Sequence, residues 1–289
     1  YIGSDLTSKI YIDDTYLTVE GGFGYHSFMG FSSTKVTKTI TDLTYTGITG
    51  NGTSYNNYVD EAGVDKKGLL INFSGNLSSF ANLYNGGNKN FNLSKTTTFG
   101  SKVTLNGVPF NQIENSELKY LSTNLLWIYV PGMGVADNVI EIDSMVLDDA
   151  RIPAMKFKHN GVNWGDATKI IFDSNGGSAL NPVFARSNDS NVNFGNTANL
   201  QVPTKSGYRF NGWKLDGTLV NAADLITGFE ITLVADWVEQ VTVTVIDGES
   251  TSTMSIDKGS LLTAPSPAKT DDAYVHFTKW TTDVEGNVE

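Results

Sequence analysis

Cysteine is absent from the 289 residues of this chain, and histidine occurs only three times, at His26, His159 and His276. The lack of cysteine excludes disulfide bonds, thiol catalysis and thiolate metal sites. None of the histidines has a glutamate or a second histidine at the spacing of an H-E-x-x-H metal site. Neither a G-x-S-x-G nucleophile motif nor a G-x-x-x-x-G-K-S/T phosphate loop occurs. The sequence therefore predicts that this chain is not an enzyme.

Basic residues are also few, because 31 aspartates and glutamates outnumber 20 lysines and arginines and give a net charge of −11. Such a chain has no excess of positive charge with which to replace phosphate counterions, so nucleic-acid binding is not expected. No apolar run reaches about 18 residues and no signal-peptide pattern opens the chain, so membrane insertion of this segment is not expected either. Hydrophobic residues nonetheless make up 39% of the chain, which is enough to form folded cores.

The composition favours β-strands joined by tight turns. Threonine, valine, isoleucine and tyrosine are abundant, and glycine and asparagine dominate the connections. Short alternating runs predict strands at Lys9–Ile12, Tyr16–Val19, Lys35–Ile40, Leu69–Phe73, Lys102–Leu105, Leu125–Val130, Val139–Ile142 and Ala154–Lys158. The helix candidates are Ser78–Tyr84 and Phe110–Glu114. Residues 1–164 are therefore predicted to form a β-sandwich region.

An alternative division of this region rests on a weak internal match. The run IYIDDTYL from Ile10 and the run IEIDSMVL from Ile140 share four residues at matching places. If the match is a true repeat, residues 1–33 are the tail of one sandwich and residues 34–164 are the next complete copy. The two runs, Lys9–Val19 and Val139–Leu147, would then occupy equivalent strand positions. A single domain of residues 1–164 is the other interpretation.

A more specific pattern follows the sandwich region. Its parts are IIFDSNGGS from Ile170, QVPTKSGYRFNGW from Gln201 and ITLVADW from Ile231. Two β-type runs thus bracket an Asn-Gly-Gly turn and the aromatic pair Phe210 and Trp213. This pattern resembles the Listeria–Bacteroides repeat, also called the internalin B repeat, a small module found in tandem on bacterial surface proteins. The resemblance implies a β-grasp-like module at residues 166–239, outside a bacterial cell, with Trp213 in its core. It identifies no ligand.

The same pattern recurs in residues 240–289. The run VTVTVIDGE begins at Val241, and Phe277 and Trp280 repeat the three-residue spacing of the first aromatic pair. This second copy ends before any equivalent of the closing ITLVADW strand. We therefore expect a truncated copy in which Val241–Ile246 pairs within an incomplete sheet, and a chain that is part of a longer array.

Trp127 and Tyr129 are the candidate ligand residues. They lie two residues apart in LLWIYV and so project from the same face of a strand, where an exposed Trp–Tyr pair is able to stack on a sugar ring. Leu126, Ile128 and Val130 on the opposite face are also apolar, which is typical of a strand buried on both sides. Packing within the core is therefore the alternative for both aromatic residues.

No catalytic, cofactor-binding or metal site is predicted. The acidic pairs Asp13-Asp14, Asp148-Asp149 and Asp271-Asp272 offer oxygen ligands for a structural Ca²⁺ ion, but none has the spacing of a calcium loop. Adjacent aspartates on a strand point to opposite faces, so solvated turn carboxylates are the simpler interpretation.

The predicted fold class is all-β to α+β: a β-sandwich region followed by two small β-grasp-like repeat modules in tandem. The predicted function is that of a non-enzymatic, extracellular stalk or adhesion segment on the cell wall of a Gram-positive bacterium, or of a secreted protein. Its partners would be a surface protein of a host or neighbouring cell, or a glycan. Two alternatives are a carbohydrate-binding accessory region of a larger surface enzyme and a subunit of a filament or surface layer.

Overall fold

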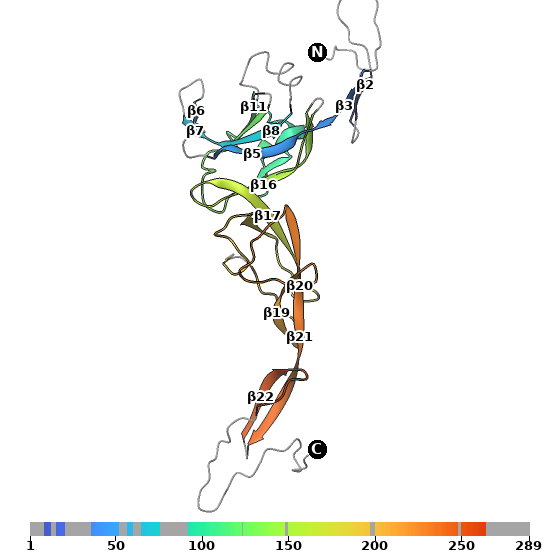
Figure 1. The fold of residues 1–289 in the computed structure, drawn as a ribbon, viewed down its shortest axis with the longest axis vertical. Coiled ribbons are helices and arrows are strands. Elements are labelled where there is room, and N and C mark those ends of the chain that lie inside the picture. The colour runs from blue at the N-terminus through green and yellow to red at the C-terminus, as the bar shows by residue number, and fades with distance from the viewer. Residues whose placement is uncertain are drawn as a thin grey trace, which may run out of the picture. The chain divides into compact units, whose positions relative to one another are not determined.

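A computed structural model describes residues 9–12, 16–20, 36–51, 57–59, 65–75, 92–122, 124–147, 150–196, 200–247 and 250–263. Within these ranges the chain is mostly β-strand (Figure 1). The helical elements there are two short turns, α2 (Thr97–Gly100) and the 3-10 helix η1 (Phe110–Gln112). The predicted all-β class with a β-sandwich is therefore confirmed.

The chain divides into two compact units. Unit 1 comprises Tyr1–Ile170, Val183–Thr197 and Ala223–Ile231, and unit 2 comprises Ile171–Pro182, Ala198–Ala222 and Thr232–Glu289. The predicted repeat module therefore contributes residues to both units. The predicted domain boundaries at 1–164, 166–239 and 240–289 stay predictions.

Unit 1 contains two sheets that face each other. The first has the strand order β10 (Val108–Pro109), β9 (Val103–Leu105), β13 (Val139–Ile142), β16 (Met155–His159) and β17 (Trp164–Asp173), with β18 (Val183–Arg186) paired to β17. The second has the order β11 (Glu117–Ser122), β12 (Leu125–Tyr129), β8 (Leu69–Ser74) and β5 (Thr44–Asn51). Smaller sheets are β1–β2–β3 (Lys9–Ile12, Tyr16–Glu20, Val36–Thr39), β14–β15–β4 (Met145–Leu147, Ala150–Ile152, Thr41–Asp42) and β6–β7 (Asn57–Val59, Asp65–Lys67).

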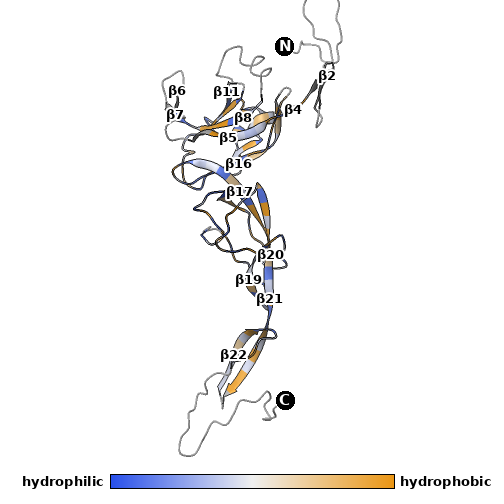
Figure 2. Ribbon diagram, in the orientation of Figure 1, coloured by the Kyte–Doolittle hydropathy of each residue, from blue (hydrophilic) through white to orange (hydrophobic). Residues whose placement is uncertain are grey.

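One hydrophobic core lies between the two facing sheets of unit 1. Alternate residues of β8 and β12 point into it, and Ile71 and Ile128 are completely buried. The other sheet contributes Ile140 and Phe157, which are also completely buried. Hydrophobic residues lie along the strands of both sheets (Figure 2). The alternation with a period of two therefore determines which side chains form the core.

All eight predicted strands of the first 160 residues are present, with ends that differ from the predicted ones by at most one residue. Of the two helix candidates, Phe110–Glu114 begins as the 3-10 helix η1, and Ser78–Tyr84 lies outside the described residues. Strand β5 was not among the predictions. Its pairing with β8 is irregular near Gly47 and Gly50, and glycines within a strand weaken the sequence signal.

The two segments of the internal match have different strand neighbours in the described residues. Strand β1 pairs with β2, with Ile10 opposite Val19, and lies at the edge of its three-stranded sheet. Strand β13 instead lies between β9 and β16 in the sandwich. These pairings do not decide the equivalence of Lys9–Val19 and Val139–Leu147, which stays a prediction.

Unit 2 contains β19 (Tyr208–Leu215), β20 (Thr218–Leu219), most of the long strand β21 (Glu230–Asp247), and β22 (Ser250–Asp257). Strand β19 pairs with β20 and with the first half of β21. The second half of β21 pairs with β22, so Val241–Ile246 lies in a hairpin opposite Thr251–Ile256. The pairing expected for Val241–Ile246 is thus present, whereas Phe277 and Trp280 lie outside the described residues.

Candidate functional site

The most specific motif of the sequence forms an aromatic cluster in unit 2. The Phe172 and Trp213 rings are 4.9 Å apart, Phe210 and Trp213 are 5.2 Å apart, and Phe210 and Trp237 are 5.6 Å apart, all between ring centroids. These rings come from β17, β19 and β21. Residues three apart on a regular strand point to opposite faces. A shift in the register between Phe210 and Gly212 places Phe210 and Trp213 on the same side.

Both indole groups of the cluster are used by the fold. Trp213 is 5% exposed, and its Nε1 donates a hydrogen bond to the Gln201 carbonyl at 3.1 Å. Nε1 of the half-buried Trp237 donates to the Ser174 carbonyl at 3.0 Å. The predicted burial of Trp213 is confirmed. The rings of both tryptophans therefore pack against other aromatic rings of the module, and their indole N–H groups form hydrogen bonds within it.

The Asn-Gly-Gly turn supports this cluster. Asn175 and Gly176 have φ values of 46° and 80°, which glycine and asparagine adopt more easily than other residues. The Asn175 side chain donates to the Ala235 carbonyl at 3.2 Å, which ties the turn to β21. A Cβ atom at Gly177 would lie 2.6 Å from Cζ2 of Trp237. The turn residues therefore have structural roles that explain the motif without a ligand.

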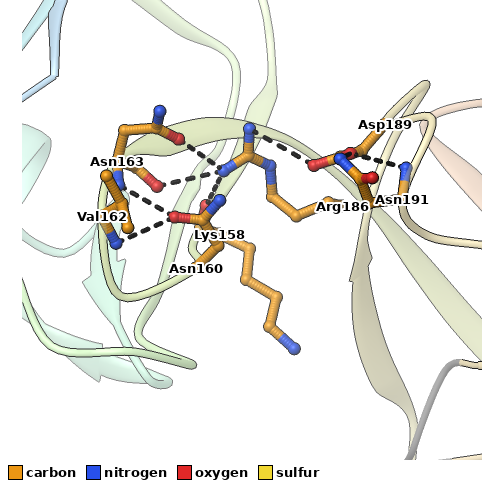
Figure 3. A network of polar contacts seen from close by, with 7 residues as sticks. All are labelled: Lys158, Asn160, Val162, Asn163, Arg186, Asp189 and Asn191. Carbon is orange, nitrogen blue, oxygen red and sulfur yellow. Dashed lines mark hydrogen bonds and ion pairs between the residues drawn. The ribbon is translucent and has the colours of Figure 1, made fainter.

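A polar network around Arg186 organises unit 1 at the end of β18 (Figure 3). Nη1 of Arg186 donates to the Asn163 carbonyl at 3.0 Å, to Oδ1 of Asn163 at 3.2 Å and to the Lys158 carbonyl at 3.4 Å. Nη2 lies 3.9 Å from a carboxylate oxygen of Asp189. A Cβ atom at Gly165 would collide with the guanidinium, at 2.0 Å from Nη2. Arg186 thus connects the β16–β17 turn with the segment after β18.

The same network fixes the backbone of both connected segments. Oδ1 of Asn160 accepts hydrogen bonds from the backbone N–H groups of Val162 and Asn163, each at 2.9 Å. Oδ1 of Asp189 accepts from the backbone N–H of Asn191 at 3.0 Å. Asp189, in the segment after β18, is therefore hydrogen-bonded within the chain, and the Arg186 guanidinium lies beside its carboxylate.

His159 is buried next to this network. It is 3% exposed, its ring meets the Trp164 ring edge-on at 5.1 Å, and its Nδ1 accepts a hydrogen bond from the Gly161 N–H at 3.1 Å. Burial and the nearby Arg186 charge lower the pKa of His159. The neutral imidazole therefore has a structural role in this turn. His26 and His276 lie outside the described residues.

The candidate ligand residues Trp127 and Tyr129 stack on each other, with ring centroids 6.2 Å apart and planes within 8°. Trp127 is completely buried, and a Cβ atom at Gly68 would come within 2.7 Å of its ring. Tyr129 is half-buried. The burial of Trp127 agrees with the packing alternative. The ligand role of the pair stays a prediction, and only the Tyr129 ring is reached by solvent.

A buried carboxylate lies beside this pair. Glu117, which is 7% exposed, accepts a hydrogen bond from Lys66 and forms an ion pair with Nζ of Lys119 at 2.8 Å. Burial alone would raise the pKa of Glu117, but the two ammonium groups hold it below its usual value. The carboxylate is therefore charged and paired, and no sequence pattern had identified it, because its partner Lys66 is remote along the chain.

The described residues contain no group of three or more histidine, cysteine, aspartate or glutamate side chains placed to hold a metal ion. The three acidic pairs proposed as calcium ligands lie outside these residues. In the same part of the chain, no helix has the length and apolar character needed to cross a membrane.

Residues 169–236 match the family model of the Listeria-Bacteroides repeat domain. This match confirms the resemblance drawn from the motif, and its limits agree closely with the predicted module at 166–239. Repeats of this family are typical of surface or extracellular proteins. No curated protein and no solved structure matches the chain.

Proposed function

We propose that this chain is a non-enzymatic segment of a bacterial cell-surface or secreted protein and acts as a spacer or adhesive array. The observation that supports this proposal most strongly is the repeat at residues 169–236, whose four aromatic rings pack against one another instead of lining an open surface. In tandem arrays each module contacts mainly its neighbours, so reach and stiffness are the property selected.

The distribution of ionisable groups supports a non-enzymatic role. The buried Glu117 is held by two lysines, and the buried His159 accepts a backbone hydrogen bond. Both groups therefore stabilise the fold, whereas a general acid or base needs a proton that it is able to exchange with a substrate.

A direct test is the exposure of the segment on intact cells of the producing bacterium. Antibodies against residues 1–289 should label intact cells or the culture medium, and mild protease treatment of intact cells should remove the label. Labelling only after lysis would contradict the proposal. A cytoplasmic protein detected in the same samples is the control for lysis.

A carbohydrate-binding role is the second candidate, and the exposed Tyr208 ring supports it. Tyr208 is 38% exposed, and Nζ of Lys205 lies 4.5 Å from its ring centroid. An exposed aromatic ring beside a hydrogen-bond donor is suited to stacking on a sugar. Binding of the purified chain to immobilised cell-wall glycans, and its loss in Tyr208→Ala but not in Leu261→Ala, would support this role; equal binding by both variants would exclude Tyr208 as the contact.

A further inference from the structure

The longest strand among the described residues, β21, pairs with a different partner strand in each half. Strand β21 pairs with β19 up to the Glu239–Tyr208 pair, and with β22 from the Gln240–Asp257 pair onward. No residue separates the two pairings. The strand that closes the matched repeat is thus also the first strand of the hairpin Gln240–Asp257, which we call the distal hairpin (Figure 1).

The backbone is hydrogen-bonded on both edges of β21 where the pairing changes. The N–H of Gln240 donates to the Gly207 carbonyl at 2.8 Å, next to β19. The carbonyl of Glu239 accepts from the N–H of Lys258 at 2.8 Å, next to β22. The carbonyl of one strand residue and the N–H of the next point to opposite edges. Strands β19 and β22 therefore lie on opposite sides of β21.

An arginine side chain crosses β21 on one face of this junction. Arg209 is opposite Val238, and Asp257 is opposite Gln240, so both side chains lie on the face shared by Val238 and Gln240. The guanidinium contacts both carboxylate oxygens, at 3.0 Å from Nε and 2.7 Å from Nη2. A bidentate pair of this kind fixes orientation as well as distance.

A second ion pair lies on the other face. Nζ of Lys258 is 2.9 and 2.8 Å from the two carboxylate oxygens of Glu239. Adjacent residues of a strand point to opposite faces, so Glu239 and Gln240 place the two ion pairs on opposite sides of the sheet. The pKa of Arg209 and of Lys258 is raised by its carboxylate partner. The four charges are complementary in pairs across the junction.

We infer that this junction is a rigid joint, in which Arg209 and Glu239 of the repeat form a docking surface for Asp257 and Lys258 of the adjoining hairpin of the same chain. The shared strand sets the direction, and the two ion pairs resist bending toward either face. Because all four groups are partly exposed, with Arg209 46% and Lys258 60% exposed, salt weakens both pairs. The biological meaning of this stiffness rests on the proposed spacer function.

The experiment uses the full chain and the absence of native cysteine. Spin labels on Thr218→Cys and Thr253→Cys, two exposed positions on β20 and β22, report the distance across the joint by pulsed electron paramagnetic resonance. A variant with two glycines inserted between Glu239 and Gln240 is the flexible reference. We expect the unmodified joint to give a distribution about half as wide as the glycine variant, because an inserted loop lacks paired backbone.

Four comparisons distinguish the contribution of the ion pairs from that of the continuous strand. The double variant Arg209→Ala with Lys258→Ala should widen the distribution toward that of the glycine variant, as should about 1 M NaCl. The exchange Arg209→Asp with Asp257→Arg should restore much of the narrow distribution. Lys214→Ala, which removes the 2.8 Å pair with Asp236 inside the repeat, is the matched control and should leave the width unchanged.

A distribution for the unmodified chain as wide as that of the glycine variant would overturn the inference. An unchanged narrow distribution in the double variant would also overturn it, because the ion pairs would then contribute nothing to the stiffness. Circular dichroism of each labelled variant verifies that the fold is retained. Neither result affects exposure on intact cells, so failure of the joint and failure of the proposed function are distinguishable.

Discussion

The sandwich and the repeat are both made of β-strands, but different side chains hold them together. In the sandwich, many aliphatic residues from two sheets share one core, in which Ile71, Leu126 and Ile140 are at most 1% exposed. In the repeat, the aromatic side chains of Phe172, Phe194 and Trp213 are buried, and the other two rings of the cluster are half-buried. Aliphatic residues, among them Ile226 and Leu233, are buried there as well. A small module has few core positions, so each ring carries a larger share of its stability. Truncating one side chain should therefore affect the two regions unequally.

The two regions also differ in how far their charged side chains are exposed to water. The sandwich buries Glu117, Lys119 and Lys156, each less than 9% exposed, whereas Arg209 and Lys258 at the distal joint remain accessible to water. Buried ion pairs lose little to salt, but removing one partner leaves an uncompensated charge. Exposed pairs are individually weak and salt-sensitive. Salt should therefore change the joint before it changes the sandwich.

The largest effect is expected for Trp213→Ala. The substitution removes the ring that contacts both Phe172 and Phe210, and it leaves the Gln201 carbonyl without its donor. A loss of about 3–5 kcal/mol in the free energy of unfolding of the repeat is expected. Urea denaturation followed by tryptophan fluorescence and circular dichroism measures it. Leu261→Ala, at a side chain that is 97% exposed, is the control and should change stability by less than about 0.5 kcal/mol. Equal midpoints for the two variants would show that the aromatic cluster is not the core.

A smaller effect is expected for Arg186→Met. The variant keeps much of the apolar stem but removes the guanidinium donor from the carbonyls of Asn163 and Lys158, and a loss of about 2 kcal/mol is expected. Arg186→Lys restores the charge, but one ammonium group does not reproduce the planar fork that contacts both segments. Thermal unfolding of the two variants measures the difference. Full stability in Arg186→Lys would mean that charge alone, and not the shape of the guanidinium, matters here.

Ile140→Val tests the shared core of the sandwich. One methylene is removed from a completely buried side chain, and a loss of about 1 kcal/mol is expected. Chemical denaturation monitored by backbone amide signals of β13 and β16 measures this change, with Val135→Ala at a 59% exposed side chain as the control. A loss larger than that of Trp213→Ala would reverse the proposed contrast between the two regions.

Features of the fold that depend on a local sequence pattern were predictable from the sequence. Short β-type runs located β8, β12 and β13, with observed bounds that differ from the predicted ones by at most one residue. The repeat motif placed Trp213 in a core, and Gly212 in a strand is the kind of residue that marks a bulge. That signal was available, since two rings three residues apart reach one face only if the strand register shifts between them.

Contacts between distant residues were not predictable in this way. Arg186 contacts Asn163 and Lys158, more than 20 residues earlier, and no spacing rule selects those acceptors. Glu117 occupies an ordinary strand position, and its partner Lys66 is 51 residues away along the chain. The partner of a polar side chain depends on the tertiary fold, whereas the burial of an apolar one follows largely from its strand position.

The smallest expected effect concerns the pH dependence of unit 1 through His159. Burial and the Arg186 charge lower the pKa of this histidine, so the folded chain favours the neutral imidazole whose Nδ1 accepts the Gly161 N–H. The unfolded chain has a histidine pKa of about 6.5, so the contribution is fully present above that pH and is lost as the pH falls through the lowered folded value. Protonation would replace the acceptor with a second donor and place a positive charge near Arg186. Thermal unfolding between about pH 7 and pH 5 should therefore show a greater fall in the midpoint for the native chain than for His159→Gln, which does not titrate in this range. Parallel curves for the two proteins would contradict this role, and a fall confined to unit 2 would place the sensitive group outside the sandwich.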